Sequence, residues 1–167
     1  MYKAKTKSGY GCSSTFYILS CGQKGFKEFD SKWAADIAHK NQSFLSEHNL
    51  APYVYSEVGK IRKKGNKLSG WGYITELAEL LCCPGNDCDC CDRYEIEDSI
   101  EDEMNSLLDE MGECDFSFGD NHAGNVGYVT RCGEKILVCI DTGDESVVNY
   151  ADDCTCIFCR NGGNCHA

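Results

Sequence analysis

The sequence predicts an α+β fold with mainly antiparallel strands, on three observations. Strand-like segments occur in pairs joined by short glycine-containing turns, which indicates hairpins. Two longer segments instead carry apolar residues at steps of three and four, as amphipathic helices do. The 167 residues are enough for one domain with an apolar core of its own.

The first half of the chain is predicted to begin with a hairpin and a helix. The hairpin covers residues 15–29 and turns at 22–25, because β-prone residues flank a pair of glycines. Asp30 or Ser31 can then cap a helix that runs to about His48. Five apolar residues are expected on one side of this helix: Ala34, Ile37, Ala38, Phe44 and Leu45.

Two strands, a second helix and a second hairpin follow. Residues 53–58 and 72–75 read as strands, and 75–81 as either a short helix or an extended connector. A helix is predicted over about 95–111, and a hairpin over 124–140. The apolar positions of this second helix are Ile96, Ile100, Met104, Leu107, Leu108 and Met111.

Composition and charge exclude several classes of protein. With 27 acidic and 16 basic residues the net charge is −11, which disfavours nucleic acid and anionic lipid as partners. No apolar run approaches the roughly 18 residues that would span a bilayer. The basic residues at the start are followed by no apolar stretch, so we expect a cytoplasmic protein without a secretion signal.

Cysteine is unusually frequent, at 14 of 167 residues, and is concentrated in two clusters. In a reducing compartment, closely spaced thiols more often bind metal than form disulfides. We therefore hypothesise a structural zinc ion that replaces missing core; disulfide pairing and unstructured thiol-rich ends are the alternatives. The candidate zinc ligands are Cys82, Cys83, Cys88, Cys90, Cys91, Cys154, Cys156, Cys159, Cys165 and His166.

Three polar residues near the second hairpin have the chemistry that phosphoryl transfer needs. Asp120 and Asn125 lie five residues apart in a glycine-containing loop, and Asp141 ends an apolar strand. One carboxylate can orient or deprotonate an attacking hydroxyl. A second carboxylate and an amide oxygen can bind Mg²⁺ on the phosphates, because hard cations prefer oxygen ligands.

Residues 118–125 and 140–143 together resemble the catalytic loop and the metal loop of kinases. The pattern Asp-x-His-x-x-Asn, followed by Ile-Asp-x-Gly, is most similar to the aminoglycoside-phosphotransferase type. The resemblance implies that Asp120 is the base that orients the acceptor, and that Asn125 and Asp141 bind Mg²⁺. It further implies ATP as the phosphate donor.

The first half of the chain matches the same family in the same order. Gly9 and Gly11 fall where a glycine loop would cover the phosphates, and Lys27 matches the lysine that binds them. Gln42 falls at the place of the glutamate that normally pairs with this lysine, so only a neutral hydrogen bond is expected there. Glu76 lies at the end of a strand that would lead into the hinge, where backbone groups face adenine.

The resemblance implies a kinase-like N-lobe over residues 1–81, with an antiparallel sheet and one helix, joined to a minimal, zinc-stapled C-lobe over 82–167. Only 26 residues follow Asp141 (167 − 141), so much of the usual large lobe has no counterpart here. The expected function is a minimal ATP- and Mg²⁺-binding protein that transfers phosphate to a hydroxyl. The alternatives are a catalytically silent mimic that binds a nucleotide or a partner protein, and a zinc-stabilised interaction module.

Overall fold

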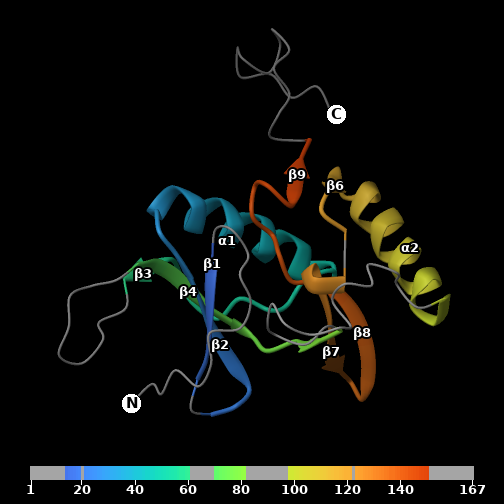
Figure 1. Cartoon of the computed structure of the whole chain (residues 1–167), viewed down its shortest axis with the longest axis horizontal. Helices are drawn as coiled ribbons and strands as arrows, with labels where there is room; N and C mark the ends of the chain where they lie inside the picture. The colour runs from blue at the N-terminus through green and yellow to red at the C-terminus, as the bar shows by residue number, and fades with distance from the viewer. Residues whose placement is uncertain (1–13, 20, 61–69, 82–97, 122, 151–167) are drawn as a thin grey trace, which may run out of the picture.

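The computed structural model is α+β, with antiparallel sheets and two helices, as the sequence predicts. It divides into a four-stranded sheet with one helix and a second group of short strands with the other helix (Figure 1). The residues that the structure describes are 14–19, 21–60, 70–81, 98–121 and 123–150.

The first sheet contains the predicted hairpin, which is confirmed. Strands β1 (Ser14–Ile18) and β2 (Lys24–Phe29) pair antiparallel around a turn in which Gly22 has a φ of 72°. Strand β4 (Trp71–Glu76) pairs with the other edge of β2, and the two-residue strand β3 (Gly59–Lys60) pairs with β4. The strand order is therefore β1-β2-β4-β3.

Helix α1 (Lys32–Glu47) lies across this sheet and is confirmed, including its cap (Figure 1). The Ser31 hydroxyl accepts a hydrogen bond from the backbone N–H of Ala34, which satisfies one of the free donors of the first turn. The predicted buried side is only partly right, because Phe44 is 42% exposed. The buried side of α1 mixes apolar and polar residues: Ala35, Ala38, Asn41, Gln42, Leu45 and Ser46.

The strand predicted over 53–58 is wrong. Only Val54 forms a bridge, to Thr75 of β4. One backbone hydrogen bond flanks the bridge on each side, from the Tyr55 N–H to the Ile74 oxygen and from the Glu76 N–H to the Tyr53 oxygen. Side chains take the other partners that a ladder would use: the Glu76 carboxylate accepts from the Tyr53 N–H, and the Ser56 hydroxyl accepts from the Ile74 N–H. The segment therefore follows β4 without forming a ladder.

The second half is built on the predicted hairpin, strands β7 (Val126–Arg131) and β8 (Glu134–Cys139). The connector at 75–81 is extended, and its strand β5 (Glu79–Leu80) pairs with β7. Helix α2 (Asp98–Glu113) is confirmed within the described residues; the first residues predicted for it, 95–97, lie outside them.

A third, two-stranded sheet follows α2 and was not predicted. Strand β6 (Phe116–Phe118) pairs antiparallel with β9 (Val147–Asn149), which closes the chain back on itself after the β7–β8 hairpin. A short 3₁₀ helix, η1 (Ala123–Asn125), leads into β7. The sheet fixes both ends of the region that contains Asp120 and Asp141.

The main apolar core joins the two halves of the chain. Leu45 and Leu50, from the end of α1 and the loop after it, pack in the same cluster as α2 and the β7–β8 hairpin. A smaller cluster lies between α1 and the first sheet, around Phe29 and Tyr73. The cluster members from α2 are Met104, Leu107 and Met111, as the sequence predicts.

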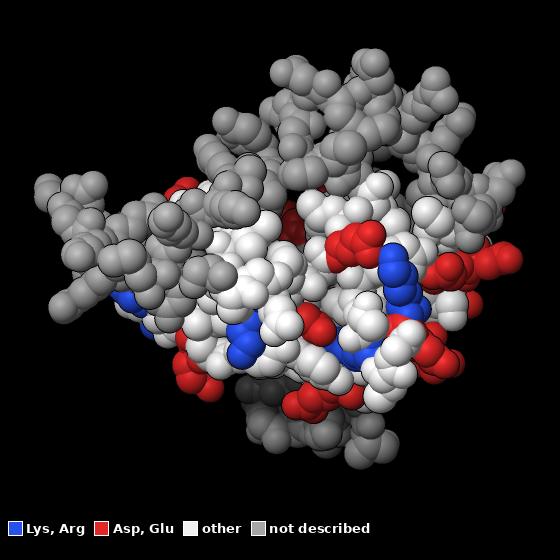
Figure 2. All heavy atoms as spheres, turned by 90° about the horizontal axis from the view of Figure 1, so that it is seen from below, with Lys and Arg blue, Asp and Glu red and all other residues white. Residues whose placement is uncertain are grey.

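The surface and the helices agree with the charge and hydropathy of the sequence. Among the described residues, neither helix is long and apolar enough to cross a membrane. Basic side chains are scattered among acidic ones over the face shown in Figure 2, rather than gathered in one patch.

Candidate functional site

The centre of the candidate site is an ion pair between Lys27 and Asp141. The Lys27 Nζ donates to Asp141 Oδ1 at 3.2 Å and to the backbone oxygen of Ile140 at 3.1 Å. The two side chains are 7% and 21% exposed, so the contact is largely shielded from water. The structure therefore brings together the lysine and the second aspartate that the sequence singled out.

The elements that carry these two residues explain why they meet. Side chains alternate along β2, so Lys27 lies on the same face as Phe29, which packs toward α1. Asp141 is the second residue after the end of β8, and its Oδ2 accepts from the Ser146 hydroxyl while its Oδ1 accepts from the Gly143 N–H. These two hydrogen bonds hold the Asp141 carboxylate in its own turn independently of Lys27.

The charges of the pair shift both pKa values in the direction that keeps them ionised. Burial alone would lower the pKa of Lys27, but the Asp141 charge outweighs it, so this pKa lies above its ordinary value. Burial would raise the pKa of Asp141, but the Lys27 charge and the Ser146 hydroxyl hold it below its ordinary value. Burial, aided by the Asp141 charge, raises the pKa of the neighbouring Cys139 thiol, which is therefore neutral near pH 7.

Asp120 and Asn125 form a second contact beside this pair. The Asn125 amide nitrogen donates to Asp120 Oδ2 at 2.7 Å and to the Asp120 backbone oxygen at 2.9 Å. The backbone oxygen of Asn125 accepts from the Ile140 N–H at 2.9 Å. Because Ile140 precedes Asp141, the open end of the β7–β8 hairpin holds the two predicted loops next to each other.

The donor atoms suit Mg²⁺ that arrives with phosphates. Both hydrogen bonds of the Asn125 side chain within the described structure use its nitrogen, so its oxygen is the atom that a cation would bind. No group of three or more His, Cys, Asp or Glu among the described residues could bind a metal alone. Mg²⁺ commonly takes one or two protein oxygens and completes its shell with phosphates and water, so Asn125 and Asp141 fit such an ion.

Helix α1 contacts the Asp141 turn through residues that the sequence did not single out. The Asn41 amide donates to the Thr142 backbone oxygen at 3.2 Å, and the Thr142 hydroxyl donates to the Ala38 backbone oxygen at 3.0 Å. Thr142 is fully buried.

The hydrogen bonds of Gln42 in the described structure go to residues other than Lys27, which corrects the expectation of a neutral hydrogen bond between the two. Its amide donates to the Pro52 backbone oxygen at 2.9 Å and to the Thr75 hydroxyl, and its oxygen accepts from the Tyr73 hydroxyl at 2.8 Å. The side chain is 1% exposed and fully engaged. Counting along the sequence placed the family's glutamate here, but the rotation of α1 directs this position toward β4.

Replacing Gln42 with Glu is expected to lower the free energy of unfolding by about 3 kcal/mol or more, because a buried carboxylate would face the Pro52 oxygen without a donor. It would not restore an ion pair with Lys27. Urea unfolding measures the loss, and Gln23→Glu, the same change at an exposed position, is the control. A more stable Gln42→Glu variant would show that this position does reach Lys27.

An aromatic ring covers the face of the sheet beside Lys27. Phe16 pairs with Lys27 across β1 and β2, so both side chains lie on one face. The Phe16 ring stands over Gly25: a Cβ built there would lie 1.9 Å from the ring's outermost carbon. No local pattern in the sequence indicates this pairing of a large and a small residue.

The remaining predicted residues do not join the site in the described structure. The Glu76 side chain accepts from Arg131 and from the Tyr53 N–H, and its own N–H donates to the Tyr53 oxygen. Its groups are thus engaged away from Lys27. Gly9, Gly11 and all ten zinc candidates lie outside the described residues.

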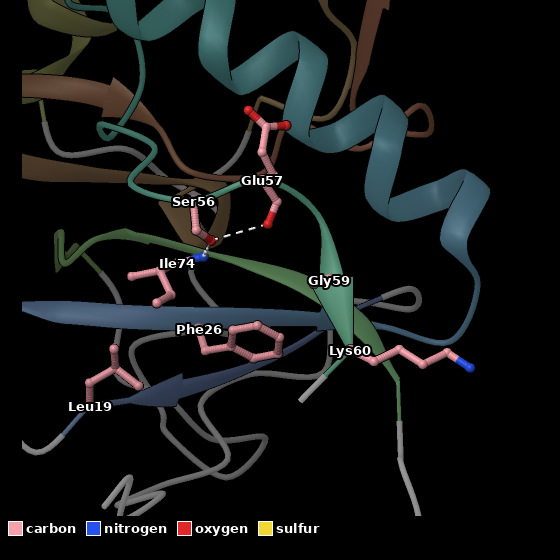
Figure 3. A pocket seen from close by; sticks show the side chains of 8 residues that line it. Leu19, Phe26, Ser56, Glu57, Gly59, Lys60 and Ile74 are labelled. Carbon is pink, nitrogen blue, oxygen red and sulfur yellow. Dashed lines mark hydrogen bonds between the residues drawn. The ribbon is translucent and has the colours of Figure 1, made fainter. Parts of the chain in front are cut away.

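A pocket of the described structure lies on the opposite face of the first sheet. Phe26 and Ile74 line it together with Leu19, and their side chains lie on the side of the sheet away from α1 (Figure 3). Because side chains alternate, the neighbour Lys27 points to the other face. We therefore keep the Lys27–Asp141 region, and not this pocket, as the candidate site.

Comparison with known proteins supports the fold. No family model and no curated protein matches the chain. The solved structures that are similar to it include one described as a high-resolution crystal structure of WbdD and one described as a medium-resolution structure of the bifunctional kinase-methyltransferase WbdD. Each has a TM-score of 0.53 and 17% identity, and the matches cover 89% of this chain.

The chain spans about a third of the length of these two neighbours, 33% and 34%. At 17% identity the likeness concerns the fold alone. Taken with the antiparallel sheet, the crossing helix and the Lys27–Asp141 contact, it supports a kinase-like fold.

Proposed function

We propose that this chain binds ATP with Mg²⁺ and transfers the terminal phosphate to a hydroxyl, as small kinases of the aminoglycoside-phosphotransferase type do. Lys27 would bind phosphate oxygens, and Asn125 and Asp141 would bind the metal. Asp120 would orient the acceptor hydroxyl and accept its proton.

The observation that carries the proposal is the convergence of Lys27 and Asp141 from opposite halves of the chain. Their contact lies beside the Asp120–Asn125 pair, through the hydrogen bond between Asn125 and Ile140. One buried amine and three oxygen-bearing side chains around two adjoining turns are the groups that phosphoryl transfer requires.

The first test is thermal unfolding with ATP, with and without Mg²⁺. At 100 times the dissociation constant, a ligand specific for the folded state adds about 2.7 kcal/mol of stability, which for this size raises Tm by roughly 5–10 °C. We expect this rise with ATP and Mg²⁺ together and a much smaller one with ATP alone. Equal Tm values with and without both ligands would contradict the proposal.

One observation favours a second candidate, the catalytically silent mimic that binds a nucleotide or a partner protein. Among the described residues of α1, no carboxylate contacts Lys27, because Gln42 is turned toward β4. Binding of ATP without phosphate transfer to water or to any alcohol would favour this candidate. The zinc-stabilised module stays a prediction, since its ligands lie outside the described residues.

A further inference from the structure

Arg131, at the end of β7, contacts three separate residues in the first half of the chain through its guanidinium. Its guanidinium donates to Asn49 Oδ1, to the Ala51 backbone oxygen at 2.8 Å, and to Glu76 Oε2 at 3.1 Å. It also stacks on the ring of Tyr53, with its carbon 3.7 Å from the ring centroid. We call this set of five residues the Arg131 clasp.

The ion pair of the clasp, between Arg131 and Glu76, is largely shielded from water, whereas Asn49 and Tyr53 are exposed. The Arg131 and Glu76 side chains are 8% and 15% exposed. The Arg131 Nε is buried and has no hydrogen-bond partner among the described residues. A buried donor without a partner lowers stability, so the other contacts of the guanidinium must offset this cost. Because the guanidinium is planar and rigid, its contacts to three different acceptors fix its orientation as well as its distance.

The elements that the clasp joins are those that carry the candidate site. Asn49 and Ala51 follow α1, which contacts Thr142 beside Asp141. Glu76 ends β4, which pairs along its whole length with the strand that carries Lys27. Arg131 itself ends β7, and β7 pairs with β8, which leads into Asp141.

A backbone hydrogen bond joins the same two parts of the chain, the loop after α1 and the β7–β8 hairpin; we call this contact region the seam. The Cys139 N–H donates to the Leu50 oxygen at 2.9 Å, so the loop after α1 is attached to both strands of the hairpin. Lys27 lies in the first sheet, on one side of this seam, and Asp141 follows the β7–β8 hairpin, on the other side. A change in the seam would change the distance between them.

We propose that Arg131 is the positioning residue that fixes the separation of Lys27 and Asp141, by fastening the loop after α1 and the end of β4 to the β7–β8 hairpin. The proposal rests on the proposed function in taking these two residues as the site. In a kinase-like fold without a carboxylate from α1 on Lys27, this clasp performs the alignment.

The test follows the Lys27 ammonium by ¹H–¹⁵N NMR near neutral pH, without nucleotide. An ammonium that is buried and bound to Asp141 and Ile140 exchanges its protons slowly with water. Arg131→Met removes every donor and keeps an apolar stem of similar reach. We expect it to speed this exchange at least tenfold or to abolish the resonance, and Arg131→Lys, which keeps one contact to Glu76, to fall between Met and wild type.

Met104→Ala is the matched control, because it creates a cavity under α2 and removes none of the hydrogen bonds of Lys27, Asp141 or Arg131. If it lowers the free energy of unfolding as much as Arg131→Met but leaves the exchange within twofold, the effect of Arg131 is positional. Equal exchange in the two variants would overturn the proposal. If Arg131→Met does not fold, Glu76→Gln, which keeps the shape and removes the charge, must still speed the exchange severalfold; no change would overturn the proposal.

This outcome is separable from nucleotide binding. Failure of ATP to bind would leave the exchange result intact. Unchanged exchange alongside Mg²⁺-dependent ATP binding would reject the role of Arg131 and leave the proposed function standing.

Discussion

Asp141→Asn is expected to lower the free energy of unfolding by about 3–5 kcal/mol, since it leaves a buried ammonium without its counter-charge. Lys27 is 7% exposed in its side chain and has Asp141 as its charged partner. The amide keeps the size of the carboxylate and can still accept from Gly143, so the loss measures charge rather than packing. Urea unfolding at pH 7 gives the value.

The same variant is expected to lose the Mg²⁺-dependent part of any stabilisation by ATP, because an amide is a far weaker magnesium ligand. Asp144→Asn is the control: it is the same change in an exposed residue three positions further on, and should cost within about 0.5 kcal/mol. A loss below 1 kcal/mol in Asp141→Asn would show that Lys27 is not held by this charge.

Asp120→Asn is expected to slow phosphate transfer by about 10²–10⁴-fold, which is the usual contribution of a positioned general base. The exposed Asp120 carboxylate accepts from the Asn125 amide at 2.7 Å, and Asn at this position keeps an oxygen that can accept the same bond. ATP binding should therefore stay within about twofold of wild type. Rates of transfer to water and to simple alcohols, together with binding titrations, separate the two effects.

The control for this variant is Asp115→Asn, an exposed aspartate on the other side of β6. Its φ is 62°, which asparagine tolerates well, so fold and transfer rate should both be unchanged. Full transfer activity in Asp120→Asn would contradict the role of general base. Absence of transfer in the wild type, with ATP bound, would instead favour the silent mimic.

The parts of the fold that the sequence predicts correctly are those with local signals. The β1–β2 and β7–β8 hairpins have glycine turns, with Gly133 at a φ of 89°, and α1 has its serine cap. Each of these elements is specified by residues within about 16 positions of one another. The sheet of β6 and β9 joins segments some 30 residues apart by three residues each, which is why no periodicity revealed it.

The candidate site is predictable for the residues next to such elements and not for those whose role depends on helix rotation. Asp141 follows β8 and Lys27 lies within β2, so their positions follow from the strands. Gln42 was assigned by counting, and a shift of one residue on a helix turns a side chain by about 100°. Asn41, its neighbour, is the residue that meets the Asp141 turn instead.

The Arg131 clasp could not be predicted, because its members come from three separate segments and none carries a recognisable pattern. Glu76 was singled out for its place near the hinge, and its carboxylate proves to be a partner of Arg131. The error at 53–58 has the same origin: the Glu76 and Ser56 side chains take backbone partners that a strand would have used.

Lys27 and Asp141 are 114 positions apart in the chain. Neither half can contain the pair, and the entropy of closing so long a loop is repaid only when the intervening sheets and helices are in place. Ligand binding at this pair would therefore report that the whole chain has folded: fragments and partly folded forms should not bind in a ligand assay even where their secondary structure persists.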